Sequence, residues 1–116
     1  VAGKRVVMID DSIVRGTTSK RLVKILRDSG AKEIHFRSVS PPIIAPCFLG
    51  IDTPKKDDLI AANMSVEELK DYLGVDSLEL CSIDNLKVIL GSSDHCFGCF
   101  TEKYPVSKPK ETHLFD

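Results

Sequence analysis

One stretch near the start of the chain, VVMIDDSIVRGTTS at Val6–Ser19, constrains the possible fold more than any other. Its first four residues, up to Ile9, are wholly apolar, which predicts a strand buried in a parallel sheet. From Thr18 onward the apolar residues recur at helical spacing, and Gly30 is placed to end that helix. A strand, a loop and a helix in this order indicate an α/β fold.

The rest of the chain favours the same class. Ile34–Val39 predicts a second strand, reached by a right-handed parallel crossover. The proline-rich stretch after it predicts an irregular loop, the kind of segment in which functional residues often lie. A helix is expected over Thr53–Ala62, with Thr53 as N-cap and Pro54 in its first turn. The capping box Ser65–Glu68 is expected to open a second helix, which stops at Gly74. A brief strand over Leu78–Cys81 and a helix over Ile83–Leu90, ended by Gly91, should follow.

Composition excludes several functions. The 116 residues suffice for one domain or a piece of one, and the 16 basic and 17 acidic side chains form no basic stripe for nucleic acid. No apolar run approaches the roughly 20 residues that cross a bilayer, and the first residues do not resemble a signal peptide. We therefore expect a cytoplasmic protein with reduced cysteines, no nucleic-acid partner and no membrane partner.

The loop after the first predicted strand combines two chemistries. Backbone N–H groups around Gly16, with the hydroxyls of Thr17 and Thr18, suit a phosphate, and Thr18 or Ser19 is expected to cap the helix. The carboxylates just before the loop suit a neutral diol or a divalent cation instead. The plain alternative is a pair of strand-end acids before an ordinary helix cap, but the unbroken order of strand, acids, loop and helix favours a sugar-phosphate site.

The four cysteines point to metal or redox chemistry rather than a disulfide framework. Cys96 and Cys99 have the spacing that lets two sulfurs reach one metal centre, and Cys47 lies in the irregular loop, so three thiolates can converge. The alternative is that Cys47 and Cys81 are small buried residues and that the Cys96–Cys99 pair is redox-active. A zinc site with three cysteines and His95 is disfavoured, because His95 directly precedes Cys96 and has little freedom to bind the same ion.

The stretch DDSIVRGTTS resembles the phosphoribosyltransferase family, and its wording is most similar to the glutamine-dependent amidotransferase members. The resemblance implies that 5-phosphoribosyl diphosphate (PRPP) binds at this stretch. Asp10 and Asp11 would bind the ribose hydroxyls and Mg²⁺, and the backbone of Val14–Thr18 would bind the 5-phosphate. The full set of implied PRPP residues is Asp10, Asp11, Ser12, Ile13, Val14, Arg15, Gly16, Thr17 and Thr18.

The segments SPPIIAPCFLGIDTP and HCFGCFTEKYP are similar to those that hold an iron–sulfur cluster in many of these family members. The resemblance therefore implies a [4Fe-4S] cluster on Cys47, Cys96 and Cys99, with the fourth ligand outside this chain. Cys81 matches no ligand position and is expected to pack against apolar neighbours.

The resemblance also implies a domain organisation. Residues 1–106 would be the C-terminal part of a phosphoribosyltransferase domain, with a parallel sheet that is incomplete here and a cysteine-containing segment at its end. Residues 107–116 would be a loose tail, and the N-terminal glutaminase domain would be absent from this chain. Further implied partners are purine nucleotides and other copies of the full-length chain.

The implied reaction is the transfer of glutamine-derived ammonia to C1 of PRPP, which gives 5-phosphoribosylamine and pyrophosphate as the first step of purine (IMP) synthesis. The chain alone is expected to be inactive, and it offers no positioned base, since His35 lies in a strand and His113 in the tail. Two alternatives stay open: a regulatory nucleotide-binding protein with the phosphoribosyltransferase fold, and a metal-binding structural module.

Overall fold

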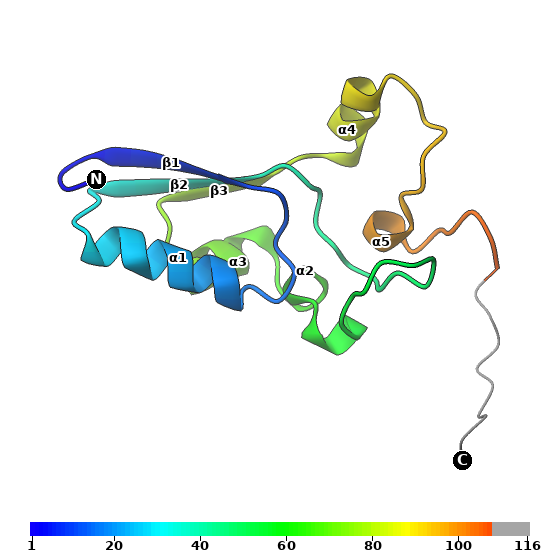
Figure 1. The fold of residues 1–116 in the computed structure, drawn as a ribbon, viewed down its shortest axis with the longest axis horizontal. Helices are drawn as coiled ribbons and strands as arrows, with labels where there is room; N and C mark the ends of the chain where they lie inside the picture. The colour runs from blue at the N-terminus through cyan, green and yellow to red at the C-terminus, as the bar shows by residue number, and fades with distance from the viewer. Residues whose placement is uncertain (108–116) are drawn as a thin grey trace, which may run out of the picture.

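The computed structural model describes residues 1–107 and contains a three-stranded parallel sheet in the order β1–β2–β3 (Figure 1). The strands are β1 (Arg5–Asp10), β2 (Glu33–Ser38) and β3 (Ser77–Leu80). The first crossover contains α1 (Thr17–Asp28), and the second contains η1 (Lys56–Asp58), α2 (Ile60–Asn63) and α3 (Val66–Leu73); α4 (Ile83–Leu90) and α5 (Gly98–Thr101) follow the sheet. The predicted α/β class with parallel strands is confirmed.

The hydrophobic core lies between the sheet and the helices α1 and α3, which cover the same face of it (Figure 1). Burial alternates along β2, and Ile34 and Phe36 on its inner face are completely buried. Val23 of α1 and Leu69 of α3 meet them there. Burial of such side chains is worth roughly 1.5–3 kcal/mol each, so this single layer of helices holds the sheet together.

The exposure of the opposite face of the sheet differs from the prediction. Val7 and Ile9 in β1 were expected to be buried, but they are 63% and 71% exposed. Their neighbours Val6 and Met8 point toward the helices and are half-buried. The strand was therefore predicted correctly and its burial only in part, because no element within residues 1–107 covers that face.

Local signals place several helix ends where they were expected. The Ser65 hydroxyl accepts a hydrogen bond from the Glu68 amide at 3.1 Å, and the Glu68 carboxylate accepts one from the Ser65 amide at 3.2 Å. Gly74 ends α3 in the left-handed conformation at a φ of 73°. The capping box and the glycine stop are thus confirmed, and Gly91 ends α4 in the same way.

The predicted helix over Thr53–Ala62 is wrong in its first half. A 3₁₀ turn begins only at Lys56, and α2 begins at Ile60. The hydroxyl of Thr53 does not cap a helix; it accepts a hydrogen bond from the Cys47 amide at 2.7 Å. Helix α5 was not expected at all. The tail predicted to be loose, with His113, falls almost wholly outside the described residues.

A polar clamp joins α1 to the strands. Arg27 donates to the Asp76 carboxylate at 2.8 Å and to the Gly74 carbonyl at 3.0 Å, and the same carboxylate accepts the Ile34 amide at 2.7 Å. The Ile34 N–H and the Arg27 guanidinium hold the pKa of Asp76 below its usual value. The clamp fixes α1 relative to β2 and to the turn before β3.

Candidate functional site

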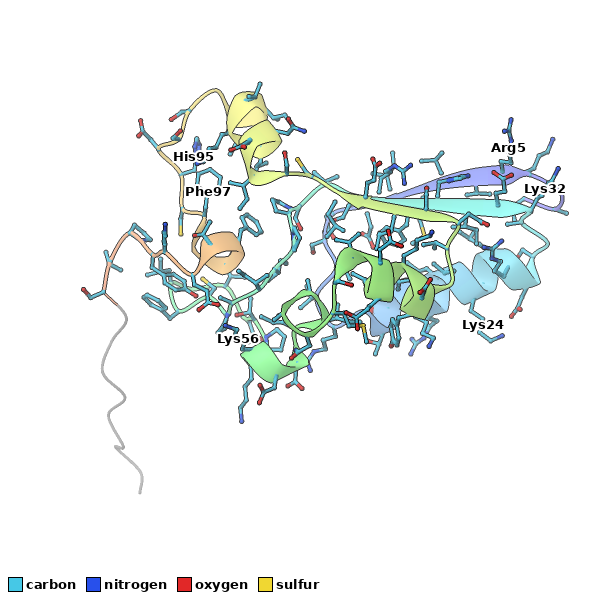
Figure 2. The ribbon with its side chains drawn as sticks, turned by 180° about the vertical axis from the view of Figure 1, so that it is seen from behind. Arg5, Lys24, Lys32, Lys56, His95 and Phe97 are labelled. Carbon is cyan, nitrogen blue, oxygen red and sulfur yellow. The ribbon has the colours of Figure 1, made fainter. Side chains whose placement is uncertain are left out.

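A cavity of about 310 Å³ lies at the carboxyl end of β1, where the chain turns into α1. This is the end of a parallel sheet at which α/β proteins bind ligands. In Figure 2, Arg5 and Lys32 mark the other end of the sheet. The side chains and backbone that line the cavity belong to Asp10, Asp11, Ser12, Val14, Arg15, Gly16, Thr17, Thr18 and Ser19.

The structure brings together every residue of the predicted loop except Ile13. The Ile13 side chain is 1% exposed and lies in the core. It anchors the loop from beneath, so it contributes to the shape of the cavity without lining it. Ser19, which the sequence analysis treated only as a possible cap, lines the cavity and is buried.

The start of α1 faces this cavity without a side-chain cap. Gly16 is the N-cap, in the left-handed conformation at a φ of 83°, so the expected capping by Thr18 or Ser19 is wrong. The amide of Lys20 makes the first α-helical bond, to the Gly16 carbonyl at 2.9 Å. The preceding amides of the first turn therefore have no intrahelical acceptor, and with the helix dipole they suit an anion.

The two acids are held by backbone bonds from the segment after β2. The amides of Val39 and Ser40 donate to the carbonyls of Asp10 and Asp11, each at 2.9 Å. The Asp10 carboxylate accepts the Asp11 amide at 2.8 Å, and the Ser12 hydroxyl lies 3.4 Å from the Asp11 carboxylate. Carboxylate oxygens fixed beside an anion-binding turn suit sugar hydroxyls or a hard cation such as Mg²⁺.

The η1–α2 segment supports the far side of the loop. The Ile60 amide donates to the Val14 carbonyl at 3.0 Å, and the Arg15 guanidinium lies 3.9 Å from the Asp58 carboxylate. The sequence analysis did not find this support, because the contacts join residues more than forty positions apart and no local motif marks them.

A second cavity, of about 420 Å³, is lined by the three cysteines that sequence analysis grouped: Cys47, Cys96 and Cys99. Cys81 lies elsewhere, half-buried, with its thiol 3.4 Å from the Ser82 carbonyl. His95 is exposed beside Phe97 and does not line this cavity (Figure 2). The remaining lining is mostly apolar and comes from Ile43, Leu49, Ile51, Thr53, Phe100 and Tyr104.

The cysteines differ in their electrostatic surroundings. The amides of Ile51, Leu49 and Gly50 lower the pKa of Cys47, and the Leu49 nitrogen lies 3.3 Å from its sulfur. Burial raises the pKa of Cys99, and the nearby thiols Cys47 and Cys96 raise it further. A bound cation would remove that mutual repulsion, because it favours the thiolate at every site.

Cysteine thiolates are ligands that both zinc ions and iron–sulfur clusters take. Sulfur ligands in an apolar lining, with amides directed at a thiolate, are typical of cluster sites. Within residues 1–107, no three histidine, cysteine or carboxylate side chains lie close enough to hold one metal ion.

No protein-family model matches the chain. It is 57% identical over 111 residues to amidophosphoribosyltransferase 2 of Arabidopsis thaliana, a chloroplastic protein, and the match covers 94% of this chain and 20% of the relative. It is 51% identical to the amidophosphoribosyltransferase of Archaeoglobus fulgidus and 48% identical to that of Bacillus subtilis, with 96% and 98% of this chain and 25% of each relative covered.

Two solved structures are similar to this chain in fold and in sequence. Glutamine PRPP amidotransferase from B. subtilis, complexed with ADP and GMP, matches with a TM-score of 0.88 and 49% identity over 97% of this chain and 26% of that one. A structure described as the allosteric regulatory enzyme of purine biosynthesis matches with a TM-score of 0.83 and 50% identity, over 90% of this chain and 24% of that one.

The fold and the loop thus define a phosphoribosyltransferase-type α/β unit. By sequence and by structure, the chain corresponds to a segment of the amidophosphoribosyltransferases, as the resemblance predicted. It spans only 20% to 25% of the length of the curated relatives it matches. Within residues 1–107, no helix is both long and apolar enough to span a membrane.

Proposed function

We propose that the cavity at the end of β1 binds PRPP with Mg²⁺, as part of an amidophosphoribosyltransferase. The observation that carries this proposal is the juxtaposition of Asp10 and Asp11 with the uncapped first turn of α1 around one cavity. The acids would bind the ribose hydroxyls and Mg²⁺, and the amides of Val14–Thr18 would bind the 5-phosphate. A ribose 5-phosphate needs both halves of such a site.

The proposed reaction forms a bond from the nitrogen of glutamine-derived ammonia to C1 of the sugar and breaks the bond from C1 to the diphosphate. Pyrophosphate leaves and 5-phosphoribosylamine remains, the first step of purine synthesis. The contribution of this chain is to hold the sugar in position and to place negative charge near an oxocarbenium-like C1. Mg²⁺ would neutralise charge on the leaving diphosphate. The glutaminase domain and the remaining diphosphate contacts would belong to the rest of the full-length protein.

Binding measurements on the full-length protein test this assignment. We expect Asp10→Asn and Asp11→Asn each to weaken Mg²⁺-dependent PRPP binding about tenfold or more, the effect of losing a hydrogen bond to a charged group. Asp71→Asn is the control, because it removes an exposed acid from α3, away from the cavity. Unchanged PRPP affinity and turnover in both loop variants would show that the assigned roles are wrong.

We also propose that purine nucleotides bind at the same phosphate loop, since the B. subtilis relative is complexed with ADP and GMP. Their 5′-phosphate would take the place of the PRPP 5-phosphate. Competition between GMP and PRPP for the full-length protein would support a shared site, and Gly16→Ala should then weaken the binding of both ligands. Binding of both ligands at once would exclude it.

For the second cavity, we propose a [4Fe-4S] cluster held by Cys47, Cys96 and Cys99 and a fourth ligand outside this chain. The chain's own part would be to provide three thiolates, an apolar lining and the amides around Cys47 that stabilise negative sulfur. Iron and sulfide analysis after anaerobic purification tests this. Four irons and four sulfides per chain are expected, whereas stoichiometric zinc without iron would indicate a structural zinc module instead.

We further propose a cytoplasmic location and association of full-length copies into an oligomer. The four cysteines, which all lie within residues 1–107, form no disulfide with one another, which agrees with a reducing compartment. Because the plant relatives are chloroplastic, fractionation of the source cells is the direct test of location, and light scattering of the full-length protein tests assembly.

A further inference from the structure

The three cysteines of the second cavity come from two segments far apart in the sequence. Cys47 lies in the irregular segment before η1, and Cys96 and Cys99 lie around α5. Backbone bonds tie the segments together at one point, where the amides of Ile44 and Ala45 donate to the Cys99 carbonyl at 2.8 and 3.1 Å. These bonds end two residues before Cys47, and the Thr53 hydroxyl that accepts the Cys47 amide at 2.7 Å belongs to the same segment, so a contact that joins Cys47's immediate neighbours to the second segment must come from elsewhere.

Tyr104 makes that contact on both sides of Cys47. Its hydroxyl donates to the carbonyl of Pro46, the residue before Cys47, at 2.6 Å. Its ring centroid lies 4.5 Å from that of Phe48, the residue after Cys47, in a tilted arrangement. An aromatic pair at this separation is favourable beyond simple burial. The side chain of Tyr104, which belongs to the same segment as Cys96 and Cys99, therefore contacts the residues on both sides of Cys47.

Gly98 shows how closely the Tyr104 ring approaches the second segment. A Cβ at residue 98 would overlap the ring atoms Cδ1 and Cε1 of Tyr104. Gly98 is not among the glycines with positive φ, so its backbone conformation is open to other residues. The glycine is required here by the close approach of the ring, directly before Cys99. The Tyr104 ring thus packs closely against Gly98 of one cysteine segment, while its hydroxyl binds the other segment.

A charged contact also joins the two segments. Lys56 of η1 forms an ion pair with Glu102, two residues before Tyr104, and Figure 2 shows Lys56 on the side of η1 near this segment. Both side chains are about half exposed, so this pair contributes little. The Tyr104 hydrogen bond and ring contacts, together with the backbone bonds to the Cys99 carbonyl, are the main connection between the two segments.

We propose that Tyr104 is a positioning residue that holds the Cys47 loop against the Cys96–Cys99 segment, so that three thiols line one cavity before any metal binds. The inference rests on the proposed cluster for its biological purpose, and its evidence is the set of contacts that Tyr104 makes with the two cysteine segments. Tyr104 supplies no ligand. It lowers the ordering cost of cluster assembly, because the thiols are already gathered.

Thiol bridging in the full-length, metal-free, reduced protein tests the proposal. Dibromobimane joins two thiols only when they lie close together, and peptide mapping identifies the bridged pair. We expect wild-type protein to give the Cys47–Cys99 bridge, and Tyr104→Phe, which keeps the ring, to give it about fivefold more slowly after losing one hydrogen bond. Tyr104→Leu should slow it about tenfold or more, because the ring contacts are lost as well. Tyr72→Phe, the matched change at the other tyrosine, should leave the rate unchanged.

A double-mutant cycle between residues 98 and 104 supplies a second measurement. Gly98→Ala should slow bridging in the wild-type background, because the new methyl group displaces the ring. In the Tyr104→Leu background the same change should have little further effect, since the ring that the methyl group would meet is gone. Additive effects of the two changes would contradict the proposed packing and overturn the assignment.

The outcomes separate this proposal from that of the cluster. If wild-type protein bridges in a Tyr104-dependent way yet binds no iron, the positioning role stands and the cluster proposal fails. If wild-type protein binds four irons per chain but bridging is equal in Tyr104→Leu, with circular dichroism unchanged, the cluster stands and the positioning role is wrong. Absence of the bridge in wild-type protein also overturns it.

Discussion

The Cδ1 atom of Ile60 lies 2.6 Å from the position that a Cβ on Gly16 would occupy. Gly16 also has a φ of 83°, a conformation that side-chain-bearing residues avoid. We therefore expect Gly16→Ala to destabilise the protein by about 1–2 kcal/mol through the backbone alone, with a further ~1 kcal/mol from the contact with Ile60. Thermal unfolding of the full-length protein measures the loss, and PRPP binding should weaken with it because the phosphate loop must move.

Two controls separate the backbone effect from the contact. Gly74 has a φ of 73°, and a Cβ there would meet nothing within 4 Å, so Gly74→Ala reports the backbone cost alone. Adding Ile60→Val to Gly16→Ala removes the Cδ1 atom and should restore part of the stability. Equal losses in Gly16→Ala and Gly74→Ala, with no recovery in the double variant, would disprove the role of Ile60.

The clamp between Arg27 and Asp76 predicts a pH dependence of stability. Because folding lowers the pKa of Asp76 below its ordinary value of 3.8, the ionised carboxylate stabilises the protein above that value. The contribution is lost as the pH falls through the lowered pKa, where the folded state also takes up the proton. Asp76→Asn should therefore reduce the Tm at about pH 6, and this reduction should shrink as the pH falls below 3.8 through the lowered pKa.

Asp71→Asn is the control for the pH series, because Asp71 is an exposed acid of the neighbouring helix α3. Its Tm difference from the wild type should be small at every pH. A Tm loss in Asp76→Asn that does not shrink at any pH below 3.8 would mean that the carboxylate charge does not contribute.

Elements set by local chemistry were predictable from the sequence. The capping box of Ser65 and Glu68 and the stop at Gly74 satisfy helix ends with neighbouring residues, so the pattern alone places α3. The strands β1 and β2 and the loop between β1 and α1 are continuous stretches of the same kind. The residues that line the cavity at the end of β1 therefore lie in a single run of the sequence.

Features set by distant contacts were not predictable. Thr53 has the form of a helix cap, but its hydroxyl accepts the Cys47 amide instead, and the helix begins later. The exposure of Val7 depends on what packs against the sheet, which the strand's own sequence does not contain. The support of the loop by Ile60 and the contact of Tyr104 with Pro46 likewise join residues that no spacing rule connects.

Thr53 itself gives a third prediction. Thr53→Val keeps the shape of the side chain but removes the oxygen that accepts the Cys47 amide at 2.7 Å. The cost of about 1 kcal/mol should appear as local opening, with hydrogen exchange at the Cys47 amide roughly fivefold faster. Thr101→Val, which removes the hydroxyl that donates to the Phe97 carbonyl at 2.9 Å, should leave exchange at Cys47 unchanged. Equal exchange in wild type and Thr53→Val would argue that this bond does not order the Cys47 loop.

The open face of the sheet gives the fourth prediction, which concerns residues 1–116 expressed alone. Val7 and Ile9 expose apolar surface on a parallel strand, and such sheets are normally covered on both faces. We therefore expect the isolated chain to bind the dye ANS, to melt without a sharp cooperative transition and to lack transferase activity. Val7→Thr with Ile9→Thr keeps β-branched side chains and should reduce dye fluorescence, whereas Val106→Thr, at an exposed position outside the sheet, should not. A cooperative transition without dye binding in the unmodified chain would show that this face needs no cover, and the sheet would then be complete as it stands.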